Sequence, residues 1–292
     1  DPWTSVCSVN PKHGLEHKLD RMIKPVERIK KVAVVGGGVA GMKAAILLSE
    51  RGHRVTLFEK SGRLGGILNI LDNVSFKWPV TNFKDYLVRQ VEKHNITVQL
   101  GVEVTKEELL MDEFDSVVLA VGASPVIPPI PGVEREHVIT AIDAYAQPDR
   151  VRGRVVVIGG GEIGVECGMY MCDLGHEAKV LEMAGTLAQD STPIHFYTMF
   201  RTAWQSREGF SSEVNARVTR IEDNGVYFER EGEEHFVPAD TVILAAGMKA
   251  NVDEAFALSD SSVYDSFRIG DCVHAGNIQK AQRSALGAAS NI

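Results

Sequence analysis

The sequence predicts an α/β protein made of two similar units, and three observations support this fold class. A short apolar run is followed at once by Gly-x-Gly-x-x-Gly and a helix-compatible apolar stretch in residues 31–48. The same order returns in residues 154–169. In both places a second apolar run ends in an acidic residue, Glu59 or Glu182, at the same distance from the last glycine. This order of strand, glycine turn, helix, strand and acid predicts a Rossmann-like dinucleotide-binding βαβ unit.

Each glycine of the first turn has its own expected role. Gly36 permits the tight turn, Gly38 lets the backbone approach a pyrophosphate, and Gly41 lets helix and strand pack closely. The helix N-terminus offers free N–H groups and partial positive charge to that pyrophosphate, and Glu59 is expected to hold a ribose hydroxyl. The turn at Gly65–Gly66 is either a simple loop or a second place where backbone N–H groups reach phosphate oxygens.

The rest of the first half is predicted to alternate between helices and strands. Residues 1–25 carry prolines and many charges and are expected to form an extended lead-in with a short helical turn. The prolines between residues 125 and 131 cannot occupy a central strand, so they are expected to connect two units. Residue periodicity predicts a helix at 83–93, a strand at 96–100 with a short continuation to 104, a helix at 106–111 and a buried strand at 114–122.

The second half repeats this order around its own glycine turn. Short strands at 213–221, 225–230 and 234–238 are expected to form a meander. The buried run at 240–247 mirrors the one at 115–122, and a helix from Asn277 to Ala289 is expected to close the chain.

Composition limits the classes of function. The 292 residues, 44% hydrophobic and 24% charged, are typical of a globular protein long enough for two domains. A net charge of −8 without a basic stripe argues against a nucleic-acid partner. Short apolar runs and the lack of a secretory signal pattern predict a cytoplasmic protein without membrane contact. Because the chain begins with Asp1 rather than Met, we expect a fragment of a longer protein.

Cysteine and histidine usage gives no sign of a disulfide or metal site. None of the four cysteines, Cys7, Cys167, Cys172 and Cys272, belongs to a Cys-x-x-Cys pair, so a thioredoxin-type redox disulfide is not expected. Small buried hydrophobes in a reducing cytosol are favoured over reactive thiols. The nine histidines are scattered without metal-ligand spacing.

Two dinucleotide motifs in one chain predict two cofactors, FAD and NADH, between which a hydride can pass. The alternative is that one unit has lost its ligand and the chain is a non-catalytic ADP-binding module. Glu182 would accept hydrogen bonds from both ribose hydroxyls and repel a 2′-phosphate, and no Arg or Lys stands in residues 183–186. We therefore expect NADH rather than NADPH. Hydride transfer requires no dedicated acid–base residue, so none is predicted.

The arrangement resembles the two-dinucleotide-binding flavoprotein family of the pyridine nucleotide–disulfide oxidoreductase type, although the Cys pair of the disulfide branch is missing. The resemblance implies a nicotinamide domain at 149–248 inserted into a flavin domain at 26–148 and 249–292. It also implies that Asp271 contacts the ribityl or phosphate region of the flavin, and that the helix after Asn277 points its N-terminus at the flavin pyrimidine. The matching segments are Gly36–Gly41 with Glu59, Gly65–Gly66, Leu119–Gly122, Gly159–Gly164 with Glu182, Leu244–Gly247 and Ile269–Asp271.

A narrower resemblance lies in residues 7–16, Cys-Ser-Val-Asn-Pro-Lys-His-Gly-Leu-Glu. This segment is similar to the one that joins the iron–sulfur region to the flavin domain in the NADH:flavin oxidoreductase / 2,4-dienoyl-CoA reductase (old yellow enzyme-like) group. The resemblance implies a preceding barrel domain with FMN and a [4Fe–4S] cluster in the full-length enzyme, with Cys7 as one cluster ligand there and an enoyl-type substrate reduced in the barrel. A small electron-delivering subunit like that of glutamate synthase is an alternative, which the 7–16 segment argues against. The oligomeric state is left open, including a homo-oligomer.

The expected binding residues form two sets. The FAD set is Gly36, Gly38, Val39, Ala40, Gly41, Glu59, Lys60, Gly65, Gly66, Val104, Ala120, Gly122, Gly270 and Asp271. The NADH set is Gly159, Gly161, Glu162, Ile163, Gly164, Glu182 and Gly247.

Overall fold

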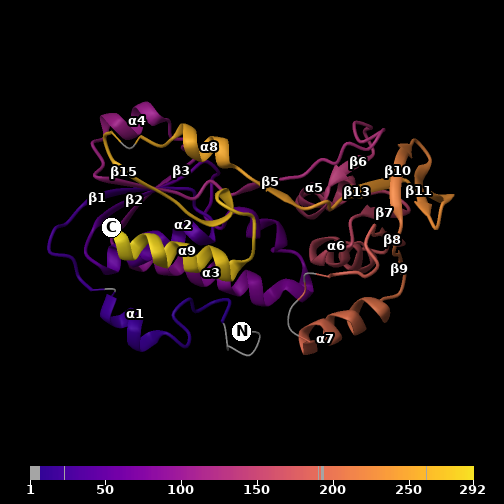
Figure 1. The fold of residues 1–292 in the computed structure, drawn as a ribbon, viewed down its shortest axis with the longest axis horizontal. Coiled ribbons are helices and arrows are strands. Elements are labelled where there is room, and N and C mark those ends of the chain that lie inside the picture. Colours follow the sequence, from indigo (N-terminus) through magenta and orange to yellow (C-terminus); the bar gives the residue numbers. More distant parts are fainter. Residues whose placement is uncertain (1–6, 23, 190, 192–193, 261) are drawn as a thin grey trace. The chain divides into compact units, whose positions relative to one another are not determined.

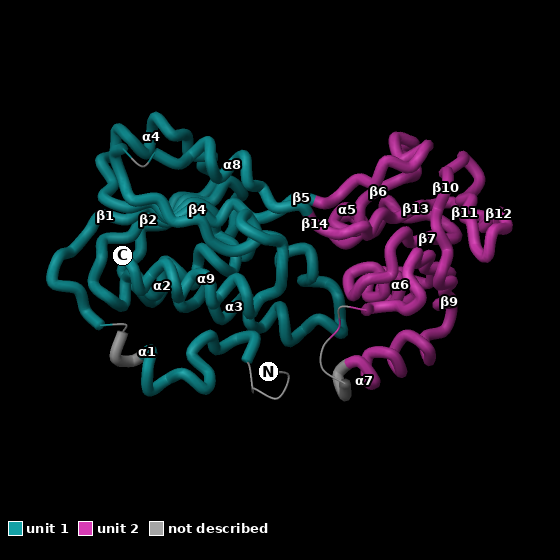
Figure 2. The backbone as a smooth tube through the Cα atoms, in the orientation of Figure 1, with its two compact units in different colours: residues 1–124, 249–292 teal, residues 125–248 magenta. Residues whose placement is uncertain are grey.

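The computed structural model describes residues 7–22, 24–189, 191, 194–260 and 262–292. It confirms the α/β fold class and divides the chain into two compact units (Figure 2). Unit 1 comprises Asp1–Ser124 and Lys249–Ile292, and unit 2 comprises Pro125–Met248, so unit 2 is inserted into unit 1. The chain passes from one unit to the other and back in β5 (Ala123–Pro125) and β14 (Met248–Ala250), which pair with each other.

Unit 1 is built on a five-stranded parallel sheet of order β15-β4-β1-β2-β3 within the described residues. The central strands β1 and β4 each contain a continuous apolar run, residues 32–35 and 117–119, that is buried, as expected for parallel strands covered on both faces. The chain runs from β1 to β2 and β3 on one side and then returns to β4 on the other side of β1, so the carboxyl end of β1 is a topological switch point, where ligands of such sheets commonly bind. The strands are β1 (Lys31–Val35), β2 (Arg54–Glu59), β3 (Ile96–Leu100), β4 (Ser116–Leu119) and β15 (Asp265–Arg268).

Helices cover both faces of this sheet (Figure 1). One face is covered by α2 (Val39–Glu50), α3 (Trp78–Lys93) and α9 (Ile278–Asn291), whose apolar sides form a common core with the strands. The other face is covered by α4 (Lys106–Met111) and α8 (Val252–Ala257). The remaining elements are α1 (Glu16–Met22), η1 (Gly66–Leu71), η2 (Ser75–Lys77) and η4 (Gly270–Cys272).

Unit 2 repeats this plan with a parallel sheet of order β6-β13-β7-β8-β9 among its described residues. Helix α6 packs against one face, where Gly168 lies against Val180, and an antiparallel meander packs against the other, where its Phe228 shares a core with Leu181. The sheet strands are β6 (Val138–Thr140), β7 (Val155–Ile158), β8 (Ala178–Leu181), β9 (Phe210–Glu213) and β13 (Thr241–Leu244). The meander is β10 (Arg217–Glu222), β11 (Gly225–Arg230) and β12 (Glu233–Pro238), and the helices are α5 (Ala141–Ala146), η3 (Pro148–Arg150), α6 (Glu162–Asp173) and α7 (Ile194–Gln205).

Several boundaries differ from those expected. Unit 2 begins at Pro125 rather than at residue 149, because β6 pairs with β13 of its sheet. The expected strand at 213–221 is two strands of different sheets, since Asn215 has a left-handed φ of 54° between β9 and β10. Residues 101–104 do not continue β3, and α3 begins at Trp78 with Pro79 in its first turn.

The described part of the lead-in packs on unit 1. Leu19 of α1 contacts the core between the sheet and α2, and the buried side chain of Gln282 on α9 donates a hydrogen bond to the carbonyl oxygen of Ser8. This segment is therefore a part of unit 1 in the structure, and it forms the short helix that the sequence predicted.

Candidate functional site

The first glycine turn follows β1, whose neighbours in the sheet are β2 and β4. Gly36 has a φ of 107°, and a Cβ there would lie 2.3 Å from the carbonyl oxygen of Ala120. A Cβ on Gly41 would lie 1.8 Å from the carbonyl oxygen of Gly36, so α2 and the turn touch backbone to backbone. Gly38 forms the N-cap of α2 in an extended conformation, and the nearest atom to its ideal Cβ is 3.9 Å away. The geometry requires glycine at the first and last positions and leaves space in front of the middle one.

Glu59, the last residue of β2, is fixed beside this turn. Its Oε2 accepts a hydrogen bond from the N–H of Gly37 at 2.7 Å, and its Oε1 accepts one from the N–H of Ser61 at 2.7 Å. The residue is only 7% exposed. A carboxylate has about four acceptor positions, so each oxygen can still accept a hydroxyl.

The second turn reproduces this arrangement in unit 2. A Cβ on Gly159 would lie 2.5 Å from the carbonyl oxygen of Ala245, and one on Gly164 would lie 1.9 Å from that of Gly159. The Oε2 of Glu182 accepts from the N–H of Gly160 at 2.6 Å, and its Oε1 accepts from the N–H of Ala184 at 2.6 Å. Both units therefore hold an acid against the second glycine of a glycine turn.

Sequence reasoning missed the role of the second glycine in each motif. A Cβ on Gly37 would lie 2.6 Å from Leu64 and 2.9 Å from Glu59 Oε2, and one on Gly160 would lie 2.5 Å from Leu187 and 2.8 Å from the Cβ of Glu182. The available signal was that both motifs carry three consecutive glycines, although the pattern itself requires only two of them.

Two further segments of unit 1 reach the first turn. The N–H of Gly65 donates to the carbonyl oxygen of Gly37 at 2.9 Å, and a Cβ on Gly66 would lie 2.9 Å from the Cα of Gly38. From the other end of the chain, a Cβ on Gly270 would lie 2.7 Å from the Cβ of Ala40. The structure thus brings the turn, the Gly65–Gly66 loop and η4 together.

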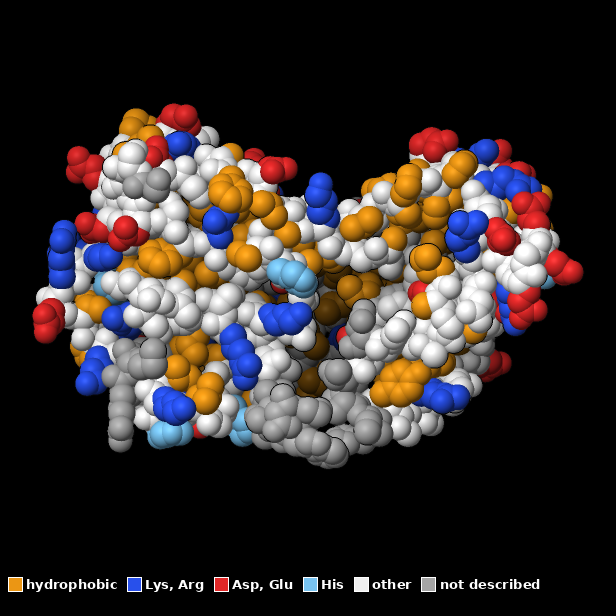
Figure 3. Space-filling model, in the orientation of Figure 1, with side chains coloured by type: hydrophobic (Ala, Val, Ile, Leu, Met, Phe, Trp, Pro, Cys, Tyr) orange, Lys and Arg blue, Asp and Glu red, His pale blue; other side chains and the backbone are white. Residues whose placement is uncertain are grey.

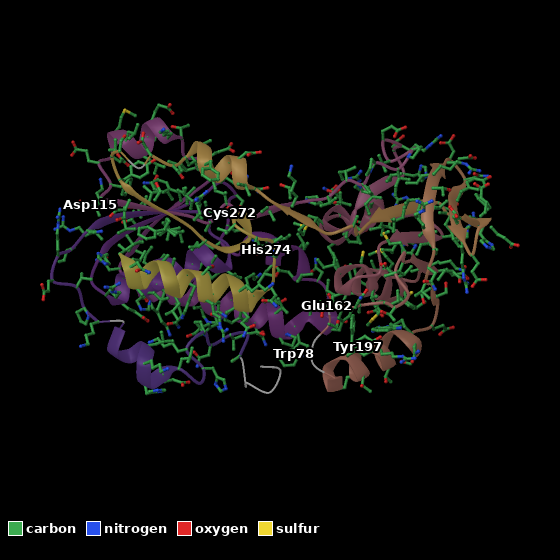
Figure 4. All side chains as sticks on the ribbon, viewed as in Figure 1. Trp78, Asp115, Glu162, Tyr197, Cys272 and His274 are labelled. Atoms are coloured by element: carbon green, nitrogen blue, oxygen red, sulfur yellow. The ribbon has the colours of Figure 1, made fainter. Side chains whose placement is uncertain are left out.

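Asp271 follows Gly270 in η4, which Cys272 marks in Figure 4. Burial raises the pKa of Asp271, while the N–H of Gly276, which donates to its Oδ1 at 3.2 Å, acts in the opposite direction. Asn277 is the N-cap of the next helix, α9, and its side chain accepts a hydrogen bond from the N–H of Lys280 at 3.0 Å. The partly buried carboxylate and the helix start lie next to each other in sequence.

The other predicted FAD residues lie around this group or away from it. Ala120 lies beneath the turn, since its carbonyl faces Gly36, and Val39 is the first residue of α2. Val104 is buried in the core on the α4 side of the sheet, and the exposed Lys60 forms an ion pair with Glu254 at 3.8 Å. Gly122 has a φ of 76° and open space where a side chain would be.

The remaining NADH residues lie at the start of α6 and after β13. Glu162 is the first residue of α6 (Figure 4), and its Oε1 accepts a hydrogen bond from Ser191 Oγ at 2.6 Å. Ile163 is 48% exposed, and no atom lies within 4 Å of an ideal Cβ on Gly161. Gly247 has a φ of 97° and its carbonyl accepts from the N–H of Val126. The surface in front of the second turn is open, as it is in the first.

Both turns fit the pyrophosphate of a dinucleotide. The first N–H groups of a helix have no intrahelical acceptor, and the open positions at Gly38 and Gly161 give an anion access to them. A side chain larger than hydrogen at either position would fill this cradle.

The described residues offer no metal centre. No group of three or more His, Cys, Asp or Glu residues within the described ranges is arranged to hold a metal ion, and Cys7 is a free, half-buried thiol.

None of the helices in the described part of the chain has the length and apolar character needed to cross a bilayer. On the face drawn in Figure 3, acidic and basic side chains of described residues are interspersed.

Comparison with known proteins agrees with the resemblance that the motifs predicted. A profile of the pyridine nucleotide-disulphide oxidoreductase family matches residues 30–285. Bilirubin reductase of Mediterraneibacter gnavus is 35% identical over 287 residues, which are 97% of this chain and 44% of that protein. NADH oxidase of Thermoanaerobacter brockii is 35% identical over 292 residues, 98% of this chain and 44% of that protein. The chain therefore spans less than half the length of these two relatives.

A solved structure gives the same picture. The complex of 2-naphthoyl-CoA reductase with 2-naphthoyl-CoA superposes with a TM-score of 0.89 at 30% identity. The superposition covers 98% of this chain and 43% of that chain. The fold of this chain, with both turns and both sheets, is therefore similar to the fold of the matching part of 2-naphthoyl-CoA reductase.

Proposed function

The chain belongs to the pyridine nucleotide-disulphide oxidoreductase family, and from this premise we propose that unit 1 binds FAD and unit 2 binds NADH. The observation that supports this most directly is the repeated arrangement of Glu59 on Gly37 and Glu182 on Gly160. One chain with two cradles of the same design is suited to hold two adenine dinucleotides. When bound, FAD supplies the capacity to accept a hydride from NADH and to release the electrons one at a time.

The protein's own contribution is to bind and orient. Gly36–Gly41, Glu59, Gly65–Gly66 and Asp271 would hold FAD, and the start of α9 would favour negative charge on a reduced flavin. Gly159–Gly164 and Glu182 would hold NADH. We assign no acid–base residue, because a hydride moves between cofactors without one.

Glu182 supports NADH rather than NADPH. Both of its oxygens are held by backbone N–H groups, so the carboxylate cannot turn away from a 2′-phosphate placed on the same ribose. Like-charge repulsion would then disfavour NADPH.

For the longer protein we propose reduction of an unsaturated, enoyl-type organic compound outside this chain. The support is that relatives of about twice its length are named for reducing bilirubin and 2-naphthoyl-CoA. FMN would be bound by the part of the longer protein outside this chain. A [4Fe–4S] cluster would take Cys7 as one of its four ligands and the other three from outside this chain; Cys7 alone does not hold a cluster. We also propose a cytoplasmic location, consistent with the four free cysteines.

The decisive experiment is an anaerobic titration of the purified, FAD-reconstituted protein with NADH. We expect a yellow flavin spectrum that bleaches on addition of NADH, and NADH-dependent reduction of an artificial dye without any organic substrate. A colourless protein that cannot be reconstituted with FAD would refute the proposal and favour the non-catalytic nucleotide-binding alternative.

A further inference from the structure

Lys84 on α3 is a buried cation for which neither cradle motif accounts. Its side chain is 7% exposed, and no other lysine or arginine whose burial the structure describes is as buried. It lies beside Phe83, one of the residues through which α3 packs into the core of unit 1. A buried ammonium is strongly unfavourable unless it is paired. The partners of Lys84 therefore show which segment it holds in place.

The partner of Lys84 is Asp72, the residue that directly follows η1 as its C-cap. Lys84 Nζ donates to Asp72 Oδ1 and lies 3.4 Å from Asp85 Oδ1. Asp72 Oδ2 accepts from Arg63 Nη1 at 3.1 Å, and the same guanidinium reaches the carbonyl oxygen of Asn69 at 3.4 Å. Asp72 thus joins the start of the 63–72 loop to its end and ties both to α3.

The stem of Lys84 also supports the loop from behind. A Cβ on Gly65 would lie 2.9 Å from the Cδ of Lys84 and 2.3 Å from Asn69 Oδ1. Gly65 and Gly66 have φ angles of 122° and 57°, and Gly65 donates to the carbonyl oxygen of Gly37. The methylene groups of Lys84 therefore lie behind the segment whose other side touches the first glycine turn.

We propose that Lys84 is a positioning residue for the FAD cradle. Its stem and its ion pair with Asp72 hold the Gly65–Gly66 turn against Gly37 and Gly38, so that this half of the cradle is formed before FAD binds. The expected weakening of FAD binding rests on the proposed function, whereas the expected loosening of the loop does not. Preformed sites bind more tightly because less ordering is required on binding.

Unit 2 provides an internal comparison. The loop after Glu182 is held to its glycine turn by a hydrogen bond from the N–H of Ala188 to the carbonyl oxygen of Gly160 at 2.7 Å. Among its described residues, no buried lysine or arginine supports that loop. A change at Lys84 should therefore act on one cradle and leave the other unchanged.

The test combines Lys84→Met, which keeps most of the stem and removes the charge, with Asp72→Asn and the double variant. In the FAD-free protein, we expect hydrogen exchange in a peptide covering residues 61–72 to accelerate about tenfold, roughly 1.4 kcal/mol of opening free energy. Exchange in residues 183–189 should not change. The Kd for FAD should rise about tenfold in Lys84→Met and at least as much in Asp72→Asn, which also loses the contact with Arg63. The double variant should bind FAD no more weakly than Asp72→Asn, because both changes break the pair between Lys84 and Asp72.

Lys93→Met is the matched control, since Lys93 lies on the same helix and is exposed. Unchanged exchange in 61–72 in Lys84→Met and Asp72→Asn would overturn the inference, as would an equal acceleration in 183–189, which would mean general destabilisation. Faster exchange in 61–72 with an unchanged Kd for FAD would overturn the positioning role. If the unmodified protein binds no FAD, the proposed function fails, while the exchange measurement still decides whether Lys84 holds the loop.

Discussion

The paired acids give the sharpest prediction, tested by Glu182→Gln and Glu59→Gln. Each carboxylate oxygen accepts one backbone N–H, so an amide would keep one bond and place an NH₂ group against the other donor. A hydrogen bond from a ribose hydroxyl to the charged carboxylate would contribute about 1.5–3 kcal/mol to binding, which corresponds to roughly a 10- to 150-fold change in affinity. Glu59 is 7% exposed, whereas Glu182 is only half-buried and solvent can replace part of its loss.

We therefore expect Glu59→Gln to weaken FAD binding about 100-fold, and Glu182→Gln to raise the KM for NADH about tenfold. The assays are titration of flavin fluorescence for the Kd of FAD and NADH-dependent dye reduction at saturating FAD for KM and kcat. Exposed Glu233→Gln serves as the control. Glu59→Gln should leave the KM for NADH unchanged, and Glu182→Gln should leave the Kd for FAD unchanged, because each acid belongs to one cradle. An unchanged KM in Glu182→Gln, or a loss of FAD affinity in that variant, would refute the assignment of the two cradles.

Three further predictions follow from single residues. Gly164→Ala should lower the Tm, because the new Cβ would lie 1.9 Å from the carbonyl oxygen of Gly159. Gly161→Ala should weaken NADH binding without lowering the Tm, because no protein atom lies within 4 Å of the new Cβ. Thermal melts and NADH titrations of the two variants test this difference. Burial lowers the pKa of His53 from 6.5, so the folded protein favours the neutral ring, and this stabilisation is present above pH 6.5 and is lost below it. Urea unfolding at pH 7.5 and 5.5 should show a smaller difference in His53→Gln. Burial raises the pKa of Cys167 to about 12, so a thiol reagent at pH 8 should modify this residue only after unfolding, as mass spectrometry would show.

Much of the fold was predictable because its signals are local. Gly36 and Gly159 are needed for the positive φ of their turns, and the acids lie at the end of the strand that follows each helix: Glu59 is the last residue of β2, and Glu182 directly follows β8. Continuous apolar runs predicted the central strands, since a parallel strand is buried on both faces. None of these features depends on residues far away in the chain.

The errors arose where distant segments decide the outcome. Residues 138–140 are a strand because they pair with β13, about a hundred positions later, and periodicity did not predict this strand. Helix α7 at residues 194–205 was not predicted. The strand expected at 213–221 was divided because its first residue completes a sheet with β8.

The sequence by itself predicted two glycine turns, each followed by a helix, a strand and an acid, because those requirements act within about thirty residues. Only the tertiary structure decided that Gly270 closes against Ala40, and that Lys84 and Asp72 hold the Gly65–Gly66 turn onto the first cradle. A lysine on a helix ordinarily faces solvent, and nothing in its local sequence shows that it will be buried. Its position depends on how α3 packs beneath a loop, and that packing is a property of the whole unit.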